Sequence, residues 1–151
     1  MRVLVQLVSK ASVTIDNKVY SSIGKGYLLL VGFTEGDNVE TMTKMADKIM
    51  KLRVFPDENG KTNKSIFDVG GEVLSVSQFT LYASLLEGNR PSFIEAMRPE
   101  KASVLYKLWN NLLLERFKSV KTGVFGADMK VDLINDGPFT LWLDSKELFK
   151  K

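Results

Sequence analysis

Alternating apolar positions in the first third of the chain predict β-strands. The alternating residues are Val3, Val5, Leu7, Val13 and Ile15. Asp16-Asn17 has the composition of a tight hairpin turn that leads into a second strand over residues 18–23. A glycine-containing turn at residues 24–26 then precedes a buried strand over residues 27–33.

Two later segments repeat apolar residues every three or four positions, which is the spacing of an amphipathic helix. The first covers residues 39–50, and Asp37 or Asn38 is suited to its N-cap. The second follows Pro99, a residue that fits the first turn of a helix, and continues to Phe117. We interpret both apolar stripes, including the methionines of the first, as faces that point into the core.

Further apolar runs predict strands over residues 54–56, 72–82, 121–125, 129–135 and 139–143. Groups of strands separated by single helices favour an α+β fold over a doubly wound parallel sheet. We therefore expect a curled, barrel-like antiparallel sheet with two main helices, and residues 1–151 as one domain.

The chain contains no Cys and no His, which excludes several kinds of active site. Disulfides, zinc–thiolate centres, cysteine nucleophiles and Ser-His-Asp triads are all ruled out. Asp57, Glu58 and Asp68 lack a spacing that would fix a metal ion, so we expect no metal. An enzyme of this composition must use carboxylates, hydroxyls, backbone dipoles or groups of its substrate.

The net charge of +3 is compatible with a phosphate-bearing partner but does not demand one. The longest apolar run, residues 27–31, is too short to span a membrane. The first residues also lack the apolar core and cleavage site of a signal peptide. We expect a cytoplasmic protein without a membrane partner.

Two segments break the local pattern. Residues 75–82 place Ser77, Gln78 and Thr80 inside an otherwise apolar predicted strand, where unpaired polar groups cost free energy. They either form a functional site or satisfy neighbouring backbone at a strand end. Residues 135–140 interrupt a strand pattern with Gly-Pro, and proline belongs at strand edges or bulges.

Together these segments resemble the D-aminoacyl-tRNA deacylase family. Residues 77–81 read SQFTL, and residues 135–140 read NDGPFT and are similar to the family's NxGPxT motif. Residues 88–93 and 122–129 resemble the family's GxRPSF and TGxFxADM segments. The likeness covers essentially the whole chain in the right order.

The resemblance implies a homodimer that hydrolyses the ester between a D-amino acid and the 3′-terminal adenosine of tRNA. Glycine mischarged on tRNA is an implied second substrate, and no cofactor is implied. The aminoacylated tRNA would bind at sites shared across the subunit interface. An aminoacyl ester is already activated, so the neighbouring ribose 2′-hydroxyl can assist attack by water without a histidine base.

The resemblance places Ser77, Gln78, Phe79 and Thr80 in the catalytic site. Thr80 is either a nucleophile, which would need an activating base, or a residue that only positions the substrate. Backbone N–H groups near Phe79 and Thr80 are candidate oxyanion donors. Phe79 would pack against the adenosine, and Met129 either lines the pocket or belongs to the core.

Gly137 and Pro138 would form the chiral filter, by resemblance joined by a cis bond and inserted into the partner subunit's site. Their carbonyl oxygens would accept hydrogen bonds from the substrate's α-amino group, so that an L side chain clashes and glycine passes. Leu7 departs from the family, which usually has Arg there, and this puts the rigidity of the filter in question.

Arg90, Lys101 and Lys121 are candidates for phosphate contact with tRNA, although solvated surface charge explains each one alone. Two other functions stay open. One is a nucleic-acid-binding dimer without catalysis. The other is a relaxed editing deacylase that also removes small L-amino acids, which the departure at Leu7 suggests.

Overall fold

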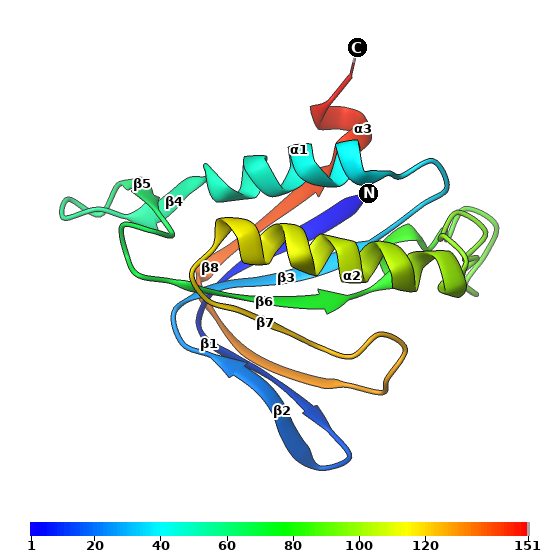
Figure 1. Ribbon diagram of the computed structural model, residues 1–151, viewed down its shortest axis with the longest axis horizontal. Helices are drawn as coiled ribbons and strands as arrows, with labels where there is room; N and C mark the ends of the chain where they lie inside the picture. Colours follow the sequence, from blue (N-terminus) through cyan, green and yellow to red (C-terminus); the bar gives the residue numbers. More distant parts are fainter. Residues whose placement is uncertain (151) are drawn as a thin grey trace.

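A six-stranded mixed sheet forms the centre of the structure, a computed structural model that describes residues 1–150 (Figure 1). Lys151, the last residue of the predicted domain, lies outside the described residues. The strands of this sheet are β1 (Arg2–Ile15), β2 (Lys18–Ile23), β3 (Gly26–Gly32), β6 (Glu72–Ser77), β7 (Val120–Thr122) and β8 (Lys130–Asp144). A separate hairpin joins β4 (Arg53–Pro56) to β5 (Thr62–Ser65).

The long strand β1 organises the sheet. Its first half pairs with β3, its second half pairs with β2, and β8 runs antiparallel along most of its length. The half that carries β2 bends away from the rest, which curls the sheet (Figure 1). The predicted turn between β1 and β2 is confirmed, because Asp16 and Asn17 both have positive φ, at 51° and 65°.

The predicted α+β fold with a barrel-like sheet and two main helices is confirmed, but the sheet is not purely antiparallel. Strand β6 runs parallel to both β3 and β7. Helix α1 (Val39–Met50) lies in the connection from β3 to β6, and α2 (Pro99–Arg116) lies in the connection from β6 to β7. Such helical crossovers return the chain to the same end of the sheet, which makes the paired strands parallel.

Both helices lie side by side over one face of the sheet (Figure 1). The side chain of Asn38 caps α1 by accepting a hydrogen bond from the N–H of Thr41 at 2.9 Å, and Pro99 begins α2 as predicted. The methionine stripe is confirmed as core, because Met42 and Met45 are fully buried. Within residues 1–150, none of the helices has the length and apolar character needed to cross a membrane.

Two apolar clusters hold the elements together. The larger one fills the space between the sheet and the helices and includes Val5, Leu7 and Trp109. The smaller one lies inside the curled part of the sheet and includes Val13, Leu28 and Val76. Each such side chain contributes about 1.5–3 kcal/mol when fully buried, so the strand curvature is maintained by packing on both sides.

The predicted strand over residues 72–82 was wrong in its second half. Strand β6 ends at Ser77, and the chain then forms a short 3-10 helix, η1 (Phe79–Tyr82). The N–H of Gln78 makes a last hydrogen bond to the carbonyl oxygen of Val31 at 2.7 Å. The polar residues therefore stand at the end of a strand, where they do not have to be buried.

The C-terminal region also differs from the prediction. The two strands predicted over residues 129–135 and 139–143 form one strand, β8, which begins at Lys130 and leaves the regular register around residues 136–139. The predicted strand over residues 121–125 is the three-residue β7. A four-residue helix, α3 (Ser145–Leu148), follows β8.

Candidate active site

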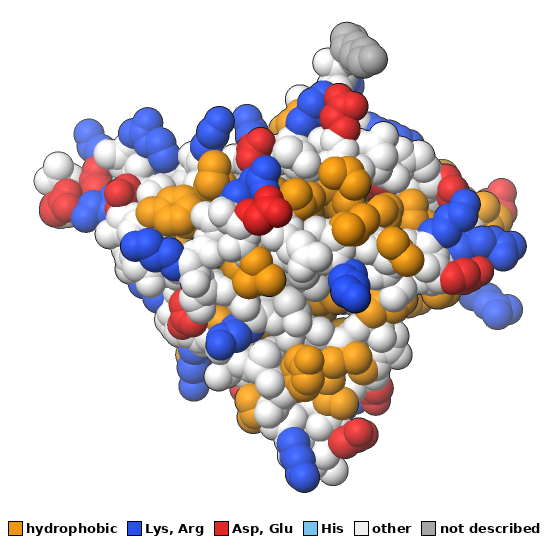
Figure 2. All heavy atoms as spheres, in the orientation of Figure 1, with side chains coloured by type: hydrophobic (Ala, Val, Ile, Leu, Met, Phe, Trp, Pro, Cys, Tyr) orange, Lys and Arg blue, Asp and Glu red, His pale blue; other side chains and the backbone are white. Residues whose placement is uncertain are grey.

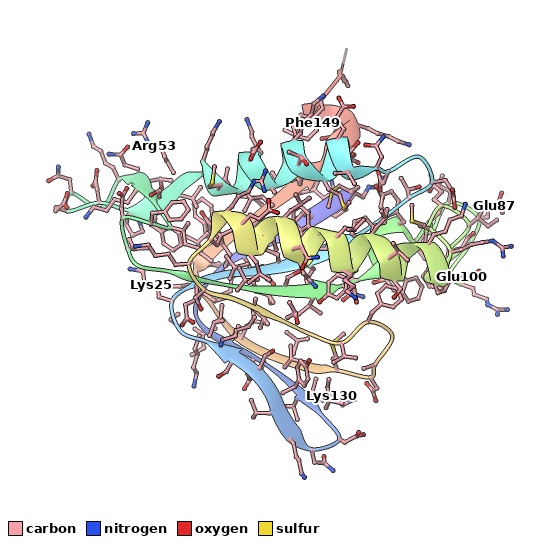
Figure 3. All side chains as sticks on the ribbon, in the orientation of Figure 1. Lys25, Arg53, Glu87, Glu100, Lys130 and Phe149 are labelled. Atoms are coloured by element: carbon pink, nitrogen blue, oxygen red, sulfur yellow. The ribbon has the colours of Figure 1, made fainter. Side chains whose placement is uncertain are left out.

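A cavity of about 750 Å³ opens where β6 ends. Its lining includes Ser77, Gln78, Phe79, Phe93, Arg98 and Met129. Two further walls come from the start of α2 and from the loop that precedes β8. Figure 3 labels Glu100 in the first and Lys130 directly after the second. The structure thus brings three of the four predicted catalytic residues together with Met129.

Gln78 and Thr80 are linked by their side chains. The Nε2 of Gln78 donates to the Oγ1 of Thr80 at 2.6 Å. Thr80 is exposed and is absent from the cavity lining among the described residues. A carboxamide is not a base at neutral pH, so this contact orients the threonine hydroxyl without activating it as a nucleophile.

Two aromatic rings stand at the cavity. Phe79 packs edge-on against Phe93, with ring centroids 5.0 Å apart. Their exposed fractions are 54% and 41%, which is high for residues of this size. Exposed aromatic faces beside a pocket are suited to stacking on a nucleobase.

Buried hydrogen bonds join α2 and the residue after β7 to β6, next to the strand end where the cavity opens. The hydroxyl of Tyr106 donates to the carbonyl oxygen of Ser75 at 2.7 Å, and the N–H of Gly123 donates to the same oxygen at 3.0 Å. Burial raises the pKa of Tyr106, so the phenol stays a neutral donor. A Cβ at Gly123 would lie 2.6 Å from the Sδ of Met129, so the methionine packs closely over this glycine.

The Gly-Pro segment lies apart from this cavity. Gly137 and Pro138 are exposed, joined by a cis peptide bond, and absent from the cavity lining within residues 1–150. Asn135 shapes the segment, because its Oδ1 accepts from the N–H of Phe139 at 2.8 Å and its Nδ2 donates to the Oγ1 of Thr140 at 2.7 Å. The structure therefore does not bring the predicted chiral filter to the site of its own chain.

Leu7 lies on β1 beside this irregular part of β8. The neighbouring residues Gln6 and Val8 pair with Thr140 and Asn135. The side chain of Leu7 is buried in the larger apolar cluster, against which Phe139 also packs. At this position the chain thus places an apolar side chain in the core.

The acidic residues considered for a metal shape a surface loop. Asp57 accepts from the N–H groups of Asn59 and Lys61, and the bond from Lys61 holds the pKa of Asp57 below its usual value. Within residues 1–150, no three Asp or Glu side chains gather in a way that could hold a metal ion.

Comparison with known proteins decides the family. A family model described as D-Tyr-tRNA(Tyr) deacylase matches residues 4–144. The chain belongs to this family. A D-aminoacyl-tRNA deacylase of Lactobacillus gasseri is 58% identical over 144 residues, covering 95% of this chain and 99% of the relative. One of Bacillus velezensis is 51% identical over 147 residues, covering 97% and 100%. The predicted family and its class, a hydrolase of an ester bond, are confirmed.

Solved structures agree with this family fold. A structure named c-Myc DNA Unwinding Element Binding Protein superposes with a TM-score of 0.90 at 41% identity, covering 95% of this chain and 98% of the other. A probable eukaryotic D-amino acid tRNA deacylase gives a TM-score of 0.81 at 15% identity, covering 94% and 97%, and shares the fold.

The basic residues predicted to contact tRNA do not form one cluster on a single element of this deacylase-family fold. Arg90 lies in the loop after η1, Lys121 lies on β7, and Lys101 on α2 pairs with Glu35 at 3.7 Å. Positive and negative side chains are mixed over the face shown in Figure 2. Sequence reasoning did not single out Phe93 or Arg98, both of which line the cavity.

Proposed function

We propose that this protein hydrolyses the ester between a D-amino acid and the 3′-terminal adenosine of tRNA. The observation that carries the proposal is the SQF segment at the wall of a cavity of about 750 Å³, in a chain of the deacylase family. A cavity of this size suits a small ligand or the end of a larger one. We expect aminoacylated tRNA to present its terminal adenosine and amino acid there.

Water attacks the ester with assistance from the ribose 2′-hydroxyl. The chain has no His, and the hydroxyl of Thr80 contacts an amide rather than a base. The protein then contributes mainly orientation, which supplies about 7–11 kcal/mol in well-aligned reactions. A substrate tRNA ending in 2′-deoxyadenosine tests this step, and an unchanged rate would exclude 2′-hydroxyl assistance.

The backbone N–H groups of Phe79 and Thr80 stabilise the developing oxyanion. They stand at the start of η1, where N–H groups have no partner within the helix. One such donor contributes about 2.7–4 kcal/mol to the transition state. Ser77 and Gln78 shape the pocket beside them, Phe79 stacks on the adenosine, and Met129 forms the facing wall.

Chiral selection comes from a second copy of the chain in a homodimer. Gly137 and Pro138 project into solvent on their own subunit and are free to enter the partner subunit's cavity. Their carbonyl oxygens accept hydrogen bonds from the substrate's ammonium group, and an L side chain would collide with the backbone. Glycine has no side chain to exclude, so glycine mischarged on tRNA is also a substrate.

The tRNA body contributes phosphate contacts outside the cavity. Arg90, Lys101 and Lys121 are exposed and serve this role together with Arg98 at the cavity wall. The reaction takes place in the cytoplasm, where charged tRNA is used.

Two alternatives are tied to specific observations. A solved structure that is 41% identical is named c-Myc DNA Unwinding Element Binding Protein, and this name favours nucleic-acid binding as a function of this chain. Leu7 occupies a position where the family resemblance has Arg, which favours a relaxed deacylase that also accepts small L-amino acids.

One assay separates the three functions. Purified protein is mixed with tRNA that carries D-alanine, L-alanine or glycine, and release of the amino acid is followed. We expect release of D-alanine and glycine only. Salt-sensitive binding without release would support the binding protein, and equal release of both alanine enantiomers would support the relaxed deacylase.

A further inference from the structure

Arg2 connects the candidate catalytic turn to the sheet. Its Nη1 donates to the carbonyl oxygen of Leu81 in η1 at 2.8 Å, and its Nε donates to the Oδ2 of Asp144 at 3.0 Å. One planar guanidinium thereby joins the start of β1, the end of β8 and the turn that contains Phe79 and Thr80.

Aromatic packing holds this guanidinium in one orientation. Its central carbon lies 4.4 Å from the ring centroid of Tyr82 and 5.3 Å from that of Trp142. Burial acts to raise the pKa of Asp144, but hydrogen bonds from the N–H of Lys146 and from Arg2 outweigh it and hold the pKa below its usual value. The carboxylate therefore stays ionised near neutral pH and keeps its bond to Arg2.

The turn itself is short and depends on outside contacts. It is closed by hydrogen bonds from the N–H of Leu81 to the carbonyl of Gln78 at 3.3 Å and from the N–H of Ala83 to the carbonyl of Thr80 at 3.0 Å. Hydrogen-bond geometry in 3-10 turns is poor, so two such bonds fix four residues only weakly. The bond from Arg2 to Leu81 adds an anchor at the end of the turn.

We propose that Arg2 is a positioning residue for catalysis, which holds η1 so that the N–H groups of Phe79 and Thr80 face the reacting ester. The inference rests on the proposed function for its kinetic consequence. Its structural part, that Arg2 immobilises η1, stands on the contacts alone. A lysine can replace Arg2 only in part, because the two bonds need a fork of planar donors that also stacks on aromatic rings.

Arg116 supplies a matched control. Its Nε donates to the Oδ1 of Asp47 at 2.7 Å and its Nη1 donates to the carbonyl of Leu112 at 3.0 Å, the same kinds of bond that Arg2 makes. Its side chain is 16% exposed, against 27% for Arg2. It joins α1 to α2, and it is not part of the cavity lining within the described chain.

The kinetic test compares Arg2→Met, Arg2→Lys and Arg116→Met on a D-aminoacyl-tRNA. Small displacements of reacting groups lower rates by about 10- to 100-fold, so we expect a fall of this size in kcat for Arg2→Met, with KM nearly unchanged. Arg2→Lys should recover only part of the loss, and Arg116→Met should keep the wild-type kcat. Equal kcat for Arg2→Met and Arg116→Met would overturn the proposal.

Amide hydrogen exchange over residues 78–84 provides a readout that does not need activity. We expect faster exchange in Arg2→Met than in wild type, and no change in Arg116→Met. Unchanged exchange in Arg2→Met would overturn the positioning role even if the wild type shows no deacylation, a result that would count against the proposed function alone. If Arg2→Met does not fold, Asp144→Asn weakens the hold on Arg2 and should give smaller shifts in the same direction.

Discussion

Single residues explain how an ester can be hydrolysed without histidine. The hydroxyl of Thr80 is held by the amide of Gln78, which cannot remove a proton from it. In the proposed mechanism, the groups that remain for catalysis are the backbone N–H donors at the start of η1 and the substrate's own hydroxyl. The sequence singled out the SQFT segment as a candidate site. It could not show that Ser77, Gln78 and Phe79 line the cavity while Thr80 does not.

The threonine variant separates the two roles. We expect Thr80→Ala to lower kcat by less than about tenfold, because the proposed mechanism uses a positioned water rather than Thr80 as the nucleophile. Single-turnover hydrolysis of a D-aminoacyl-tRNA measures this. Thr43→Ala, which removes a hydroxyl bonded to the carbonyl of Val39 in α1, is the control. Complete loss of turnover in Thr80→Ala alone would indicate a covalent mechanism.

At the scale of elements, the periodic segments and the turn at Asp16-Asn17 were predictable, whereas the end of β6 at Ser77 and the parallel strand pairing were not. Residues 39–50 form α1 as expected because their apolar stripe has helical spacing over three turns. The prediction of one strand over residues 72–82 was wrong because the apolar pattern continues through Phe79 and Leu81, where the backbone already forms η1. The parallel pairing of β3, β6 and β7 depends on the crossovers, which no local pattern records.

Gly32 tests the contact between β3 and η1, the candidate catalytic turn. A Cβ at this glycine would lie 2.9 Å from the carbonyl oxygen of Gln78 and 3.2 Å from the Cβ of Leu81. We expect Gly32→Ala to displace the turn, lowering the free energy of unfolding by about 1–3 kcal/mol and the deacylation rate with it. Urea denaturation and kinetics measure both.

The control for this change is Gly24→Ala. A Cβ at Gly24 meets only the carboxylate oxygen of Glu72, at an ordinary 3.6 Å. We expect the Gly24→Ala variant to keep the wild-type deacylation rate. Equal activity in the two variants would show that close packing under Gln78 is not required.

A substitution at Asn135 tests the role of the Gly-Pro segment without changing Gly137 or Pro138 themselves. Removing its side chain frees the N–H of Phe139 and the hydroxyl of Thr140, so residues 136–139 should lose their fixed position. We expect Asn135→Ala to lower the ratio of D- to L-aminoacyl-tRNA hydrolysis more than it lowers stability. Asn38→Ala, which removes the N-cap of α1 and costs about 1 kcal/mol, should leave that ratio unchanged.

At the scale of the whole molecule, carboxylates make stability depend on pH. A hydrogen bond from the N–H of Gly24 is the main cause that holds the pKa of Glu72 below its ordinary 4.5. Despite the burial of its carboxylate, the pKa of Asp144 also lies below its ordinary 3.8, because of its bonds from Lys146 and Arg2. The unfolded chain therefore binds protons first as the pH falls, and the stabilisation that is complete above these ordinary values is lost as the pH drops through the folded pKa values.

Urea midpoints at pH 7 and pH 3 measure this loss of stability in acid. We expect a lower midpoint at pH 3 for the wild type and a smaller difference between the two pH values for Asp144→Asn. A wild-type midpoint that is the same at both pH values would contradict the prediction.

The central claim is that the cavity beside the SQFT segment hydrolyses D-aminoacyl esters of tRNA and spares their L counterparts. The most direct measurement is the ratio of kcat/KM for one tRNA charged with D-tyrosine and the same tRNA charged with L-tyrosine. We predict that the D-ester turns over and that the L-ester stays intact over the same time. Equal turnover of both esters, or survival of the D-ester, would contradict the claim.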